Sequence, residues 1–328
     1  MMETTAEDVV IVGAGLAGLL LARELRAHGR RPVLLEKSRG PGGRLATKRV
    51  GAAVFDQGAQ FFTARTPRFA AEVESWRAAG VAAPWPGGAP HRFIGSPSMN
   101  AVGKHLAAGL DVRREAKVLS VARRAGAWDI TLENSAPLRA RELVLTAPVP
   151  QSLALLAAGG FTLPSPLAAE LAALDFHPCL ALMLTLAGPG AVPAGGFAPN
   201  DGGPVRWIAD NTAKGVSPGE PAAITVHFSP AFSEENYGLT EAEVLARARP
   251  VIDEWLGSEI TDTALHRWRY SEPKSRHREP CVWLPEDGLG LAGDGLGGPK
   301  VEGAATSAFA LAERIRHWAL GRKAHMRA

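Results

Sequence analysis

Apolar positions in the first 36 residues fall into two short runs separated by one stretch with helical spacing. Val9–Val12 is a continuous apolar run, an amphipathic stretch then extends to Ala27, and a second run, Pro32–Leu35, ends at Glu36. Short continuous apolar runs predict buried strands, and apolar residues three and four apart predict a helix. The pattern therefore predicts a strand–helix–strand unit at the start of the chain.

Three glycines in the first loop of this unit have a spacing that carries chemistry. Gly13 lets the chain turn sharply, Gly15 lets the backbone approach a pyrophosphate, and Gly18 lets the helix pack close to the strand. The helix N-terminus supplies N–H groups and a partial positive charge to hold that pyrophosphate. Glu36 is placed to bind a ribose hydroxyl, and its charge would repel a 2′-phosphate. The motif predicts an adenine dinucleotide without that phosphate, either NAD or FAD.

The segment that follows Glu36 favours FAD. Lys37 to Arg44 contains two adjacent glycines and an arginine that an NAD site does not need. It resembles the GGR segment of the flavin-containing amine oxidase superfamily, in which the arginine lies along the FAD pyrophosphate. A guanidinium suits that place because it can hold two phosphate oxygens at once.

The far end of the chain supplies a matching second half. Leu289–Asp294 predicts a short buried strand that ends in an acid, Gly295–Gly298 a loop, and Val301 the start of a helix that extends to about Trp318. In FAD proteins of this type the aspartate contacts the ribityl chain, and the helix N-terminus points at the flavin. Its dipole stabilises the negative charge of reduced flavin.

Several segments resemble the renalase family and its bacterial members, which are FAD-dependent oxidases within the amine oxidase superfamily. The matching segments are 40–49, 55–63, 145–151, 266–271, 293–295 and 301–308. Together, the motif and the resemblance assign these residues to FAD: Gly13, Gly15, Leu16, Ala17, Gly18, Glu36, Lys37, Gly43, Arg44, Gln60, Phe61, Val118, Asp294 and Val301. Pro299 stands where some relatives have the cysteine that links FAD, so the resemblance implies non-covalent FAD.

The remaining pattern predicts an α/β fold in which the FAD-binding domain is discontinuous. Residues 117–121, 128–132 and 142–145 read as a β-meander, and 180–186, 205–209, 224–228 and 267–270 as an antiparallel sheet with helices on one side. A capping box at Thr240 and Glu243 predicts a helix to Leu256. We expect a Rossmann-like FAD-binding domain from 1–70, 100–158 and 276–328, and an antiparallel-sheet substrate domain from 71–99 and 159–275. The Gly/Pro-rich stretches 84–97 and 188–204 are expected to be connecting loops.

Composition narrows the class of protein further. The chain has 328 residues, 46% hydrophobic and 21% charged, with a net charge of +3, which is too weak to indicate nucleic acid. Cys179 and Cys281 do not make a disulfide framework, and we expect both in the core. The apolar stretch at 9–22 is too short and too rich in glycine to span a bilayer, and no basic segment precedes it. We therefore expect a cytoplasmic protein without membrane or nucleic-acid partners.

Five residues of the substrate domain are candidates for the substrate site, each with a structural alternative. Trp207 and Trp268 could form an aromatic wall for a planar ring or pack in a core. His227 could donate a hydrogen bond to substrate or be a satisfied structural histidine. Arg206 and Arg269 could meet substrate phosphates or point to solvent. The histidines show no metal-ligand spacing, so no metal is expected, and no carboxylate pair or lysine stands out as a base. Hydride abstraction from a dihydropyridine needs none.

The resemblance implies an oxidase that takes hydride from isomeric dihydro-NAD(P) to FAD and passes the electrons to O₂, giving NAD(P)⁺ and H₂O₂. Its partners would be this small-molecule substrate and O₂. An amine oxidase or a flavin desaturase on the same scaffold is the alternative enzyme, because a fold does not fix a function. A third possibility is a non-enzymatic dinucleotide-fold protein like the Rab GDP-dissociation inhibitors, which the intact motif of Gly13, Gly15, Gly18, Glu36 and Arg44 disfavours.

Overall fold

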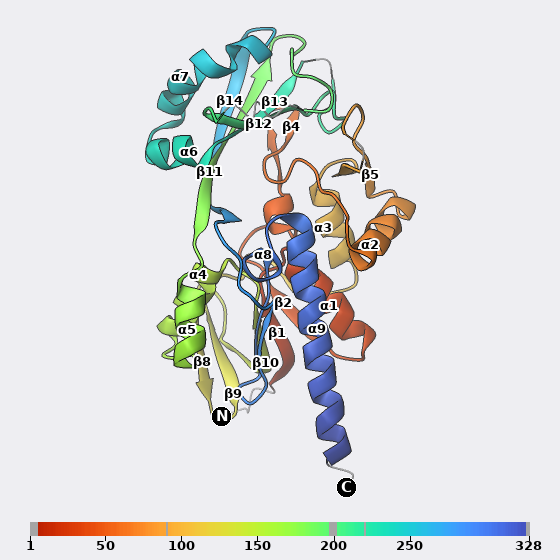
Figure 1. The fold of residues 1–328 in the computed structure, drawn as a ribbon, viewed down its shortest axis with the longest axis vertical. Coiled ribbons are helices and arrows are strands. Elements are labelled where there is room, and N and C mark those ends of the chain that lie inside the picture. The colour runs from red at the N-terminus through yellow and green to blue at the C-terminus, as the bar shows by residue number, and fades with distance from the viewer. Residues whose placement is uncertain (1–5, 90, 197–201, 220, 326–328) are drawn as a thin grey trace. The chain divides into compact units, whose positions relative to one another are not determined.

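The chain folds into two compact units, each made of segments that are separate in the sequence (Figure 1). The structure is a computed structural model. It describes the whole chain except residues 1–5, 90, 197–201, 220 and 326–328. The first unit comprises residues 1–43, 103–175 and 272–328, and the second comprises residues 44–102 and 176–271.

The first unit is an α/β domain. Its strands are β1 (Glu7–Val12), β2 (Pro32–Leu35), β7 (Asp111–Arg113), β8 (Val118–Arg124), β9 (Ala127–Leu132), β10 (Leu138–Leu145), β15 (Val282–Leu284) and β16 (Leu289–Leu291). Its helices are α1 (Leu16–Ala27), α4 (Val149–Ala158), α5 (Ser165–Ala172), α8 (Asp294–Gly297) and α9 (Lys300–His325), and α3 (Asn100–Ala107) begins at its boundary.

The central sheet of this unit has β1 in its interior. The strand order is β15-β16-β10-β1-β2-β7, and β8 and β9 extend antiparallel from β10. Strands β16, β10, β1, β2 and β7 run parallel, so their carboxyl ends share one edge. The chain leaves β1 through α1 towards β2, whereas the neighbour on the other side, β10, comes much later in the sequence. Such a switch point is where open α/β sheets bind ligands.

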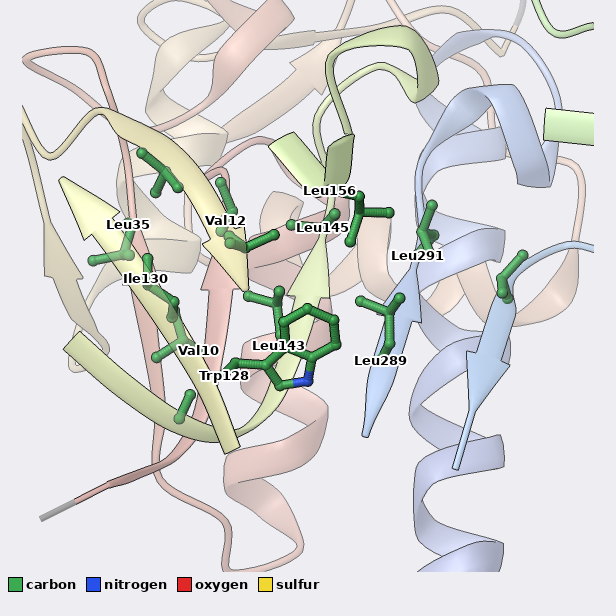
Figure 2. Packing of buried hydrophobic residues seen from close by; sticks show 14 of the residues in the cluster. Val10, Val12, Leu35, Trp128, Ile130, Leu143, Leu145, Leu156, Leu289 and Leu291 are labelled. Carbon is green, nitrogen blue, oxygen red and sulfur yellow. The ribbon is translucent and has the colours of Figure 1, made fainter. Parts of the chain in front are cut away.

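Every second side chain of the central strands lies in one buried cluster (Figure 2). One face meets Trp128, whose ring is 0% exposed and whose Nε1 donates to the carbonyl of Asp287 at 2.8 Å. On the other face, a Cβ built at Gly290 would lie 3.0 Å from Leu311 of α9, so the helix approaches the strand closely there. The cluster drawn in Figure 2 includes Val10, Val12, Leu35, Ile130, Leu143, Leu145, Leu156, Leu289 and Leu291. Cover on both faces is what makes continuous apolar strands stable in a parallel sheet.

The second unit is built on an antiparallel four-stranded sheet with the order β12-β13-β11-β14. Val244, Ala248 and Ile252 of α7 belong to the same buried cluster as strand residues of this sheet, so α7 covers one face. The elements are β3 (Thr47–Val50), β4 (Ala53–Asp56), α2 (Pro67–Ala78), β5 (Ala82–Pro84), β6 (Phe93–Gly95), β11 (Phe176–Leu186), β12 (Val205–Asp210), β13 (Ala223–Phe228), α6 (Pro230–Asn236), α7 (Glu241–Ile252) and β14 (Ile260–Pro273), with short 3₁₀ turns at Gly43–Leu45 and Asp253–Trp255.

The predicted fold class is confirmed: the chain is α/β, with a Rossmann-like domain and a separate antiparallel sheet domain. The predicted meander is confirmed by the pairing of β8 with β9 and of β9 with β10. Both cysteines are buried, and neither forms a disulfide. The expected helix from Thr240 is α7. It begins with a capping box, as predicted, and it ends at Ile252 rather than Leu256.

Three predicted boundaries are wrong. The expected loop at 84–97 contains the end of β5 and all of β6, which pair with each other as a small hairpin. The expected loop at 295–298 falls largely in the short helix α8, because the glycines allow it to pack directly on α9: a Cβ at Gly297 would lie 2.0 Å from the carbonyl oxygen of Gly303. The last helix begins at Lys300 and continues to His325, beyond Trp318. Residues 197–201 of the expected loop 188–204 lie outside the described residues.

The division of the chain into an FAD-binding and a substrate domain stays a prediction. The compact units differ from this scheme in two large segments. Residues 159–175, which include α5, group with the first unit, although they were expected in the substrate domain. Residues 44–70 group with the second unit, although they were expected in the FAD-binding domain. The reason is β4, which packs on the four-stranded sheet and is hydrogen-bonded to it, for instance from the backbone N–H of Asp56 to Oδ1 of Asn211 at 3.0 Å.

Candidate functional site

The three glycines of the turn after β1 have two different roles: two allow close packing, and one leaves open space. Gly13 has φ +105°, and a Cβ there would lie 2.7 Å from Oγ1 of Thr146. A Cβ at Gly18 would lie 2.1 Å from the carbonyl oxygen of Gly13, so any side chain would push α1 away from β1. A Cβ at Gly15, by contrast, would meet nothing within 4 Å. Gly13 and Gly18 are therefore needed for packing, and Gly15 is the glycine that faces open space.

The N-terminus of α1 follows this open position and lacks a side-chain cap. Gly15 is the N-cap residue and provides no side-chain cap, and the first turn contains no acidic residue. Leu16, Ala17 and Gly18 begin the helix, so their N–H groups have no intrahelical acceptor. An uncapped helix N-terminus beside a glycine is an anion site, and a dinucleotide pyrophosphate fits it.

Glu36 is held against the same turn. It follows β2, is 6% exposed, and accepts the N–H of Ala14 on Oε2 at 2.9 Å and the N–H of Ser38 on Oε1 at 2.8 Å. These bonds fix the carboxylate, and no cation in the described part of the chain pairs with it. Each oxygen keeps further acceptor capacity for a hydroxyl donor. The neighbouring Lys37, also predicted for this site, has an exposed side chain.

The paired glycines pack on the turn from the other side. The N–H of Gly42 donates to the carbonyl of Ala14 at 2.8 Å, and a Cβ at Gly43 would lie 3.1 Å from Cα of Gly15. Gly42 and Gly43 have φ of +121° and +57°, a backbone region that other residues rarely adopt. The sequence Gly42-Gly43 therefore builds part of the wall of the predicted cofactor site in the first unit.

The C-terminal motif reaches the same edge of the central sheet. β16 pairs in parallel with β10, and the N–H of Ala292 continues the ladder to the carbonyl of Leu145 at 3.1 Å. Asp294, 5% exposed, opens α8 just past this edge. Gly13, Glu36, Thr146 and Asp294 thus all follow the carboxyl ends of parallel strands. Val301 lies half-buried in the first turn of α9, and Val118, at the start of β8, lies in the buried cluster of the first unit.

A buried ion pair anchors the loop after β4 in the second unit. Nζ of Lys214 lies 2.6 Å from Oδ2 of Asp56, and both side chains are 0% exposed. Oδ1 of Asp56 accepts the hydroxyl of Thr47 at 2.8 Å and the N–H of Met99 at 2.9 Å. Burial lowers the pKa of Lys214, and the attraction of Asp56 opposes that shift. Neither residue was among the sequence candidates.

The backbone carbonyl of Gln57, the next residue in this loop, accepts hydrogen bonds from two side-chain rings. Nε2 of His227 lies 3.1 Å, and Nε1 of Trp268 3.0 Å, from the carbonyl oxygen of Gln57. Because a carbonyl only accepts, His227 carries its hydrogen on Nε2, which leaves Nδ1 as an acceptor. Burial, together with the charges of Lys214 and Arg206, lowers the pKa of His227 to about 4 against the opposing effect of the hydrogen bond to Gln57, so the ring is neutral at pH 7.

The sequence candidates Gln60 and Phe61 complete this loop. Nε2 of Gln60 donates to the carbonyls of Asp56 and Gly58, the latter at 3.1 Å. These two bonds orient the amide, and its Oε1 is buried without a hydrogen-bond partner among the described residues. The ring of Phe61 packs against Trp207, with ring centroids 5.1 Å apart. A buried acceptor without a donor is a position that a ligand N–H or O–H can satisfy.

The structure brings three of the five substrate candidates together and leaves the other two exposed. Trp207 pairs with His227 across β12 and β13, and Trp268 shares an acceptor with His227, so these three come together on one side of the sheet. Arg206 is exposed at the irregularity in β12, and Arg269 is exposed on β14. Arg44, in the second unit, donates from Nη1 to the carbonyl of Ser271 at 2.8 Å.

Sequence reasoning missed Asp56, Lys214, Trp85 and Arg92. The last two lie in the Gly/Pro-rich stretch that was expected to be a plain loop, and the first two are 158 positions apart. The available signals were one acid directly before the Gln57-Gly58-Ala59-Gln60 segment, and a tryptophan and an arginine in a stretch rich in glycine and proline.

Comparisons with known protein families and structures agree with this arrangement. Residues 11–73 match the NAD(P)-binding Rossmann-like domain, and residues 86–316 match the family of flavin containing amine oxidoreductases. The second match covers more than half of the chain, so the chain belongs to the flavin containing amine oxidoreductase family. The description of that family names flavin and oxidoreductase chemistry, which favours the enzymatic alternatives over the non-enzymatic one.

Solved structures with similar folds cover nearly the whole chain. A protein of Exiguobacterium sp. 255-15 named "Putative protoporphyrinogen oxidase" matches with a TM-score of 0.74 at 14% identity, over 95% of this chain and 99% of that one. Putrescine oxidase bound to putrescine matches with 0.68 at 14% identity, over 97% and 100%. A fatty acid isomerase from P. acnes matches with 0.65 at 12% identity, over 94% and 98%. At these identities the likeness shows the fold alone.

Curated relatives match only in a short segment. Lysine-specific histone demethylase 1 homolog 2 of Arabidopsis thaliana is 47% identical over 49 residues, which is 15% of this chain and 7% of that protein. Protein anon-37Cs of Drosophila melanogaster is 48% identical over 55 residues, 16% of this chain and 11% of that protein. The chain thus matches only a small part of either relative's length. Within the described residues, none of the helices combines the length and apolarity that a bilayer span needs.

Proposed function

We propose that the chain is a renalase-type oxidase that converts isomeric dihydro-NAD(P) to NAD(P)⁺. The overall reaction balances as dihydronicotinamide + H⁺ + O₂ giving nicotinamide cation + H₂O₂. When bound, FAD supplies the hydride-accepting ring. The residues assigned to FAD in each unit belong to this proposal: Gly13, Gly15, Leu16, Ala17, Gly18, Glu36, Lys37, Gly43, Arg44, Gln60, Phe61, Val118, Asp294 and Val301.

The observation that carries the proposal over an amine oxidase is the state of the buried carboxylates. Among the described residues of the second unit, the buried carboxylates are Asp56 and Asp210. Asp56 is paired with Lys214 at 2.6 Å, and Oδ1 of Asp210 accepts the N–H groups of Thr212 and Ala213 at 2.7 and 3.2 Å. Asp56 is the one of these two that adjoins Gln57, the residue that His227 and Trp268 contact, and a protonated amine would find it already paired with a lysine. A dihydronicotinamide ring needs no counter-ion.

The side chains of the second unit would act by binding and orientation. Trp207 and Trp268 would form part of an aromatic wall beside a planar substrate, and His227 stays neutral while its Nε2 is held by Gln57. The neutral ring leaves Nδ1 as an acceptor for a substrate amide N–H. None of these groups needs to remove a proton from the reacting carbon, because hydride leaves an electron-rich ring directly.

Anaerobic stopped-flow mixing tests the proposal. Flavin absorbance should bleach rapidly with 2- or 6-dihydro-NAD(P) and slowly with benzylamine or a polyamine. Rapid bleaching by an amine, with none by any dihydronicotinamide isomer, would move the protein to the amine oxidase alternative.

We also propose that FAD is bound without a covalent link, because Pro299 follows Gly298 where a linking cysteine would stand. Acid precipitation of the yellow protein should release all of the flavin into the supernatant. Colour that remains in the washed pellet would contradict this.

A further inference from the structure

Three aromatic side chains of the second unit pack into one cluster, which we call the aromatic box: Phe61, Trp85 and Trp207. The ring centroids lie 5.6 Å apart for Phe61 and Trp85, 5.1 Å for Phe61 and Trp207, and 5.7 Å for Trp85 and Trp207. Phe61 follows β4, Trp85 follows β5, and Trp207 lies in β12. Three elements distant in sequence therefore bring their rings together in one apolar cluster, with the ring planes tilted by 48° to 57° to one another.

The loop at 194–196 holds two of the rings in place. Nε1 of Trp85 donates to the carbonyl of Ala194 at 3.1 Å. Gly196, with φ +68°, passes so close that a Cβ there would lie 2.6 Å from Cζ2 of Trp207 and 2.9 Å from Cη2 of Trp85. The tryptophans are thus packed tightly against backbone, and the box is a preformed surface.

Arg92 lies over this surface. Its Cζ is 4.5 Å from the ring centroid of Phe61 and 5.0 Å from that of Trp207. A guanidinium over aromatic rings is held by its face, and its N–H donors remain directed outward in its plane. None of the described residues accepts a side-chain hydrogen bond from Arg92 or pairs with it. Arg77 contrasts with it: Arg77 lies 5.9 Å from the Phe93 ring but donates to Glu74 at 2.7 and 2.9 Å.

The other polar groups at the box are also donors. Nε1 of Trp207 is buried and has no acceptor among the described residues. Nζ of Lys214 lies 5.2 Å from the Trp85 ring, but it is paired with Asp56. The box therefore presents one cation whose charge no described carboxylate balances and one buried N–H donor. That surface favours an anion bearing several acceptor oxygens and repels a protonated amine.

We propose that Arg92 and the aromatic box form an anion subsite that takes the pyrophosphate of a dinucleotide substrate. The subsite rests on the proposed function for the identity of that substrate, but its anion preference stands on Arg92 and the rings alone. Arg92 determines specificity in two directions: it contributes affinity for phosphate-bearing substrates and lowers affinity for cationic ones.

Binding of inorganic pyrophosphate to the FAD-loaded enzyme, measured by titration calorimetry, tests the subsite without turnover. We expect R92Q to weaken binding about ten- to hundred-fold, the range for loss of a charged hydrogen-bonding partner. R92K should lose less, because it keeps the charge but not the planar fork. R77Q is the matched control and should bind as the unaltered enzyme does. Unchanged affinity in R92Q, or no binding to the unaltered enzyme at millimolar pyrophosphate, would overturn the subsite.

A second measurement separates the subsite from the proposed function. Anaerobic flavin reduction is followed with 6-dihydro-NAD and with the neutral 1-methyl-1,6-dihydronicotinamide, which lacks the pyrophosphate. R92Q should raise the half-saturating concentration for the first about ten-fold or more and leave that for the second unchanged. If pyrophosphate binding depends on Arg92 but neither compound reduces the flavin, the subsite holds and the proposed substrate is wrong. If both reduce it equally in R92Q and the unaltered enzyme, the substrate holds and the subsite is wrong.

Discussion

Glu36 in the first unit and Asp56 in the second are both buried acids at the end of a strand, but different groups stabilise their negative charges. Glu36 accepts two backbone N–H groups, from Ala14 and Ser38, and no described cation pairs with it. Asp56 pairs with Lys214 and also accepts from Thr47 and Met99. Glu36 therefore keeps capacity for a ligand hydroxyl, whereas Asp56 has its charge satisfied within the fold.

The difference indicates which buried acid can bind a ligand. A carboxylate stabilised only by backbone N–H groups keeps its negative charge, and that charge can attract a donor group of a ligand beside the turn. A carboxylate bonded to a buried lysine and two further donors orients the backbone around it, here the loop carrying Gln57, Gln60 and Phe61. We infer a recognition role for Glu36 and a positioning role for Asp56, and substitutions can separate the two.

The largest expected effect is on the buried pair. Lys214→Met should lower the free energy of unfolding by about 3–5 kcal/mol, because it leaves the Asp56 carboxylate buried without its counter-charge. Urea unfolding of the apoprotein measures this. Lys274→Met is the control: its bond to Asp175 is 2.8 Å long, but the two side chains are 38% and 65% exposed, so the loss should stay below about 1 kcal/mol.

The double variant Asp56→Asn with Lys214→Met sharpens the same test. It removes both charges, so its free energy of unfolding should exceed that of Lys214→Met alone even though it carries one more substitution. Strictly additive losses would mean that the two side chains do not act as a pair, and the positioning role of Asp56 would then lack support.

The next effect concerns Glu36. Glu36→Ala should weaken FAD binding by about 1.5–3 kcal/mol, because a charged hydrogen bond to the ribose is lost. Titration of the apoprotein with FAD measures this, and Glu36→Gln is the matched variant because it keeps an acceptor oxygen for the N–H of Ala14 or Ser38. If Glu36→Ala binds FAD as tightly as the unaltered protein, Glu36 is not in the cofactor site.

The same comparison explains what the sequence could predict. Glu36 and its glycines lie within one strand–helix–strand unit, so local periodicity and spacing placed them at the correct ends of β1, α1 and β2. The ends of β10 and β16 were also predictable, because each is a short apolar run that must be buried. The pairing of Asp56 with Lys214 was not, since it depends on how β4 packs on the four-stranded sheet, and no local pattern encodes that. The positions of Trp85 and Arg92 could not be predicted for a related reason. A Gly/Pro-rich composition indicates how the backbone of a stretch behaves, but it does not indicate which distant side chains its large residues contact.

The smallest expected effect is a pH dependence at His227. Its pKa in the folded protein is lowered to about 4, chiefly by burial, with repulsion from Lys214, Arg206 and His266, while an unfolded histidine titrates near 6.5. The unfolded chain therefore binds more protons between these two values, so the contribution of neutral His227 is complete above about pH 6.5 and is lost as the pH falls towards 4. His227→Gln keeps an N–H donor for the carbonyl of Gln57 but does not titrate. Between pH 7 and 4.5, the unaltered protein should lose of order 1–2 kcal/mol more free energy of unfolding than this variant, less than the full shift because the side chain is partly exposed. Carboxylates and His266 titrate in both proteins and cancel in the difference, so parallel curves would show that the fold does not hold His227 neutral.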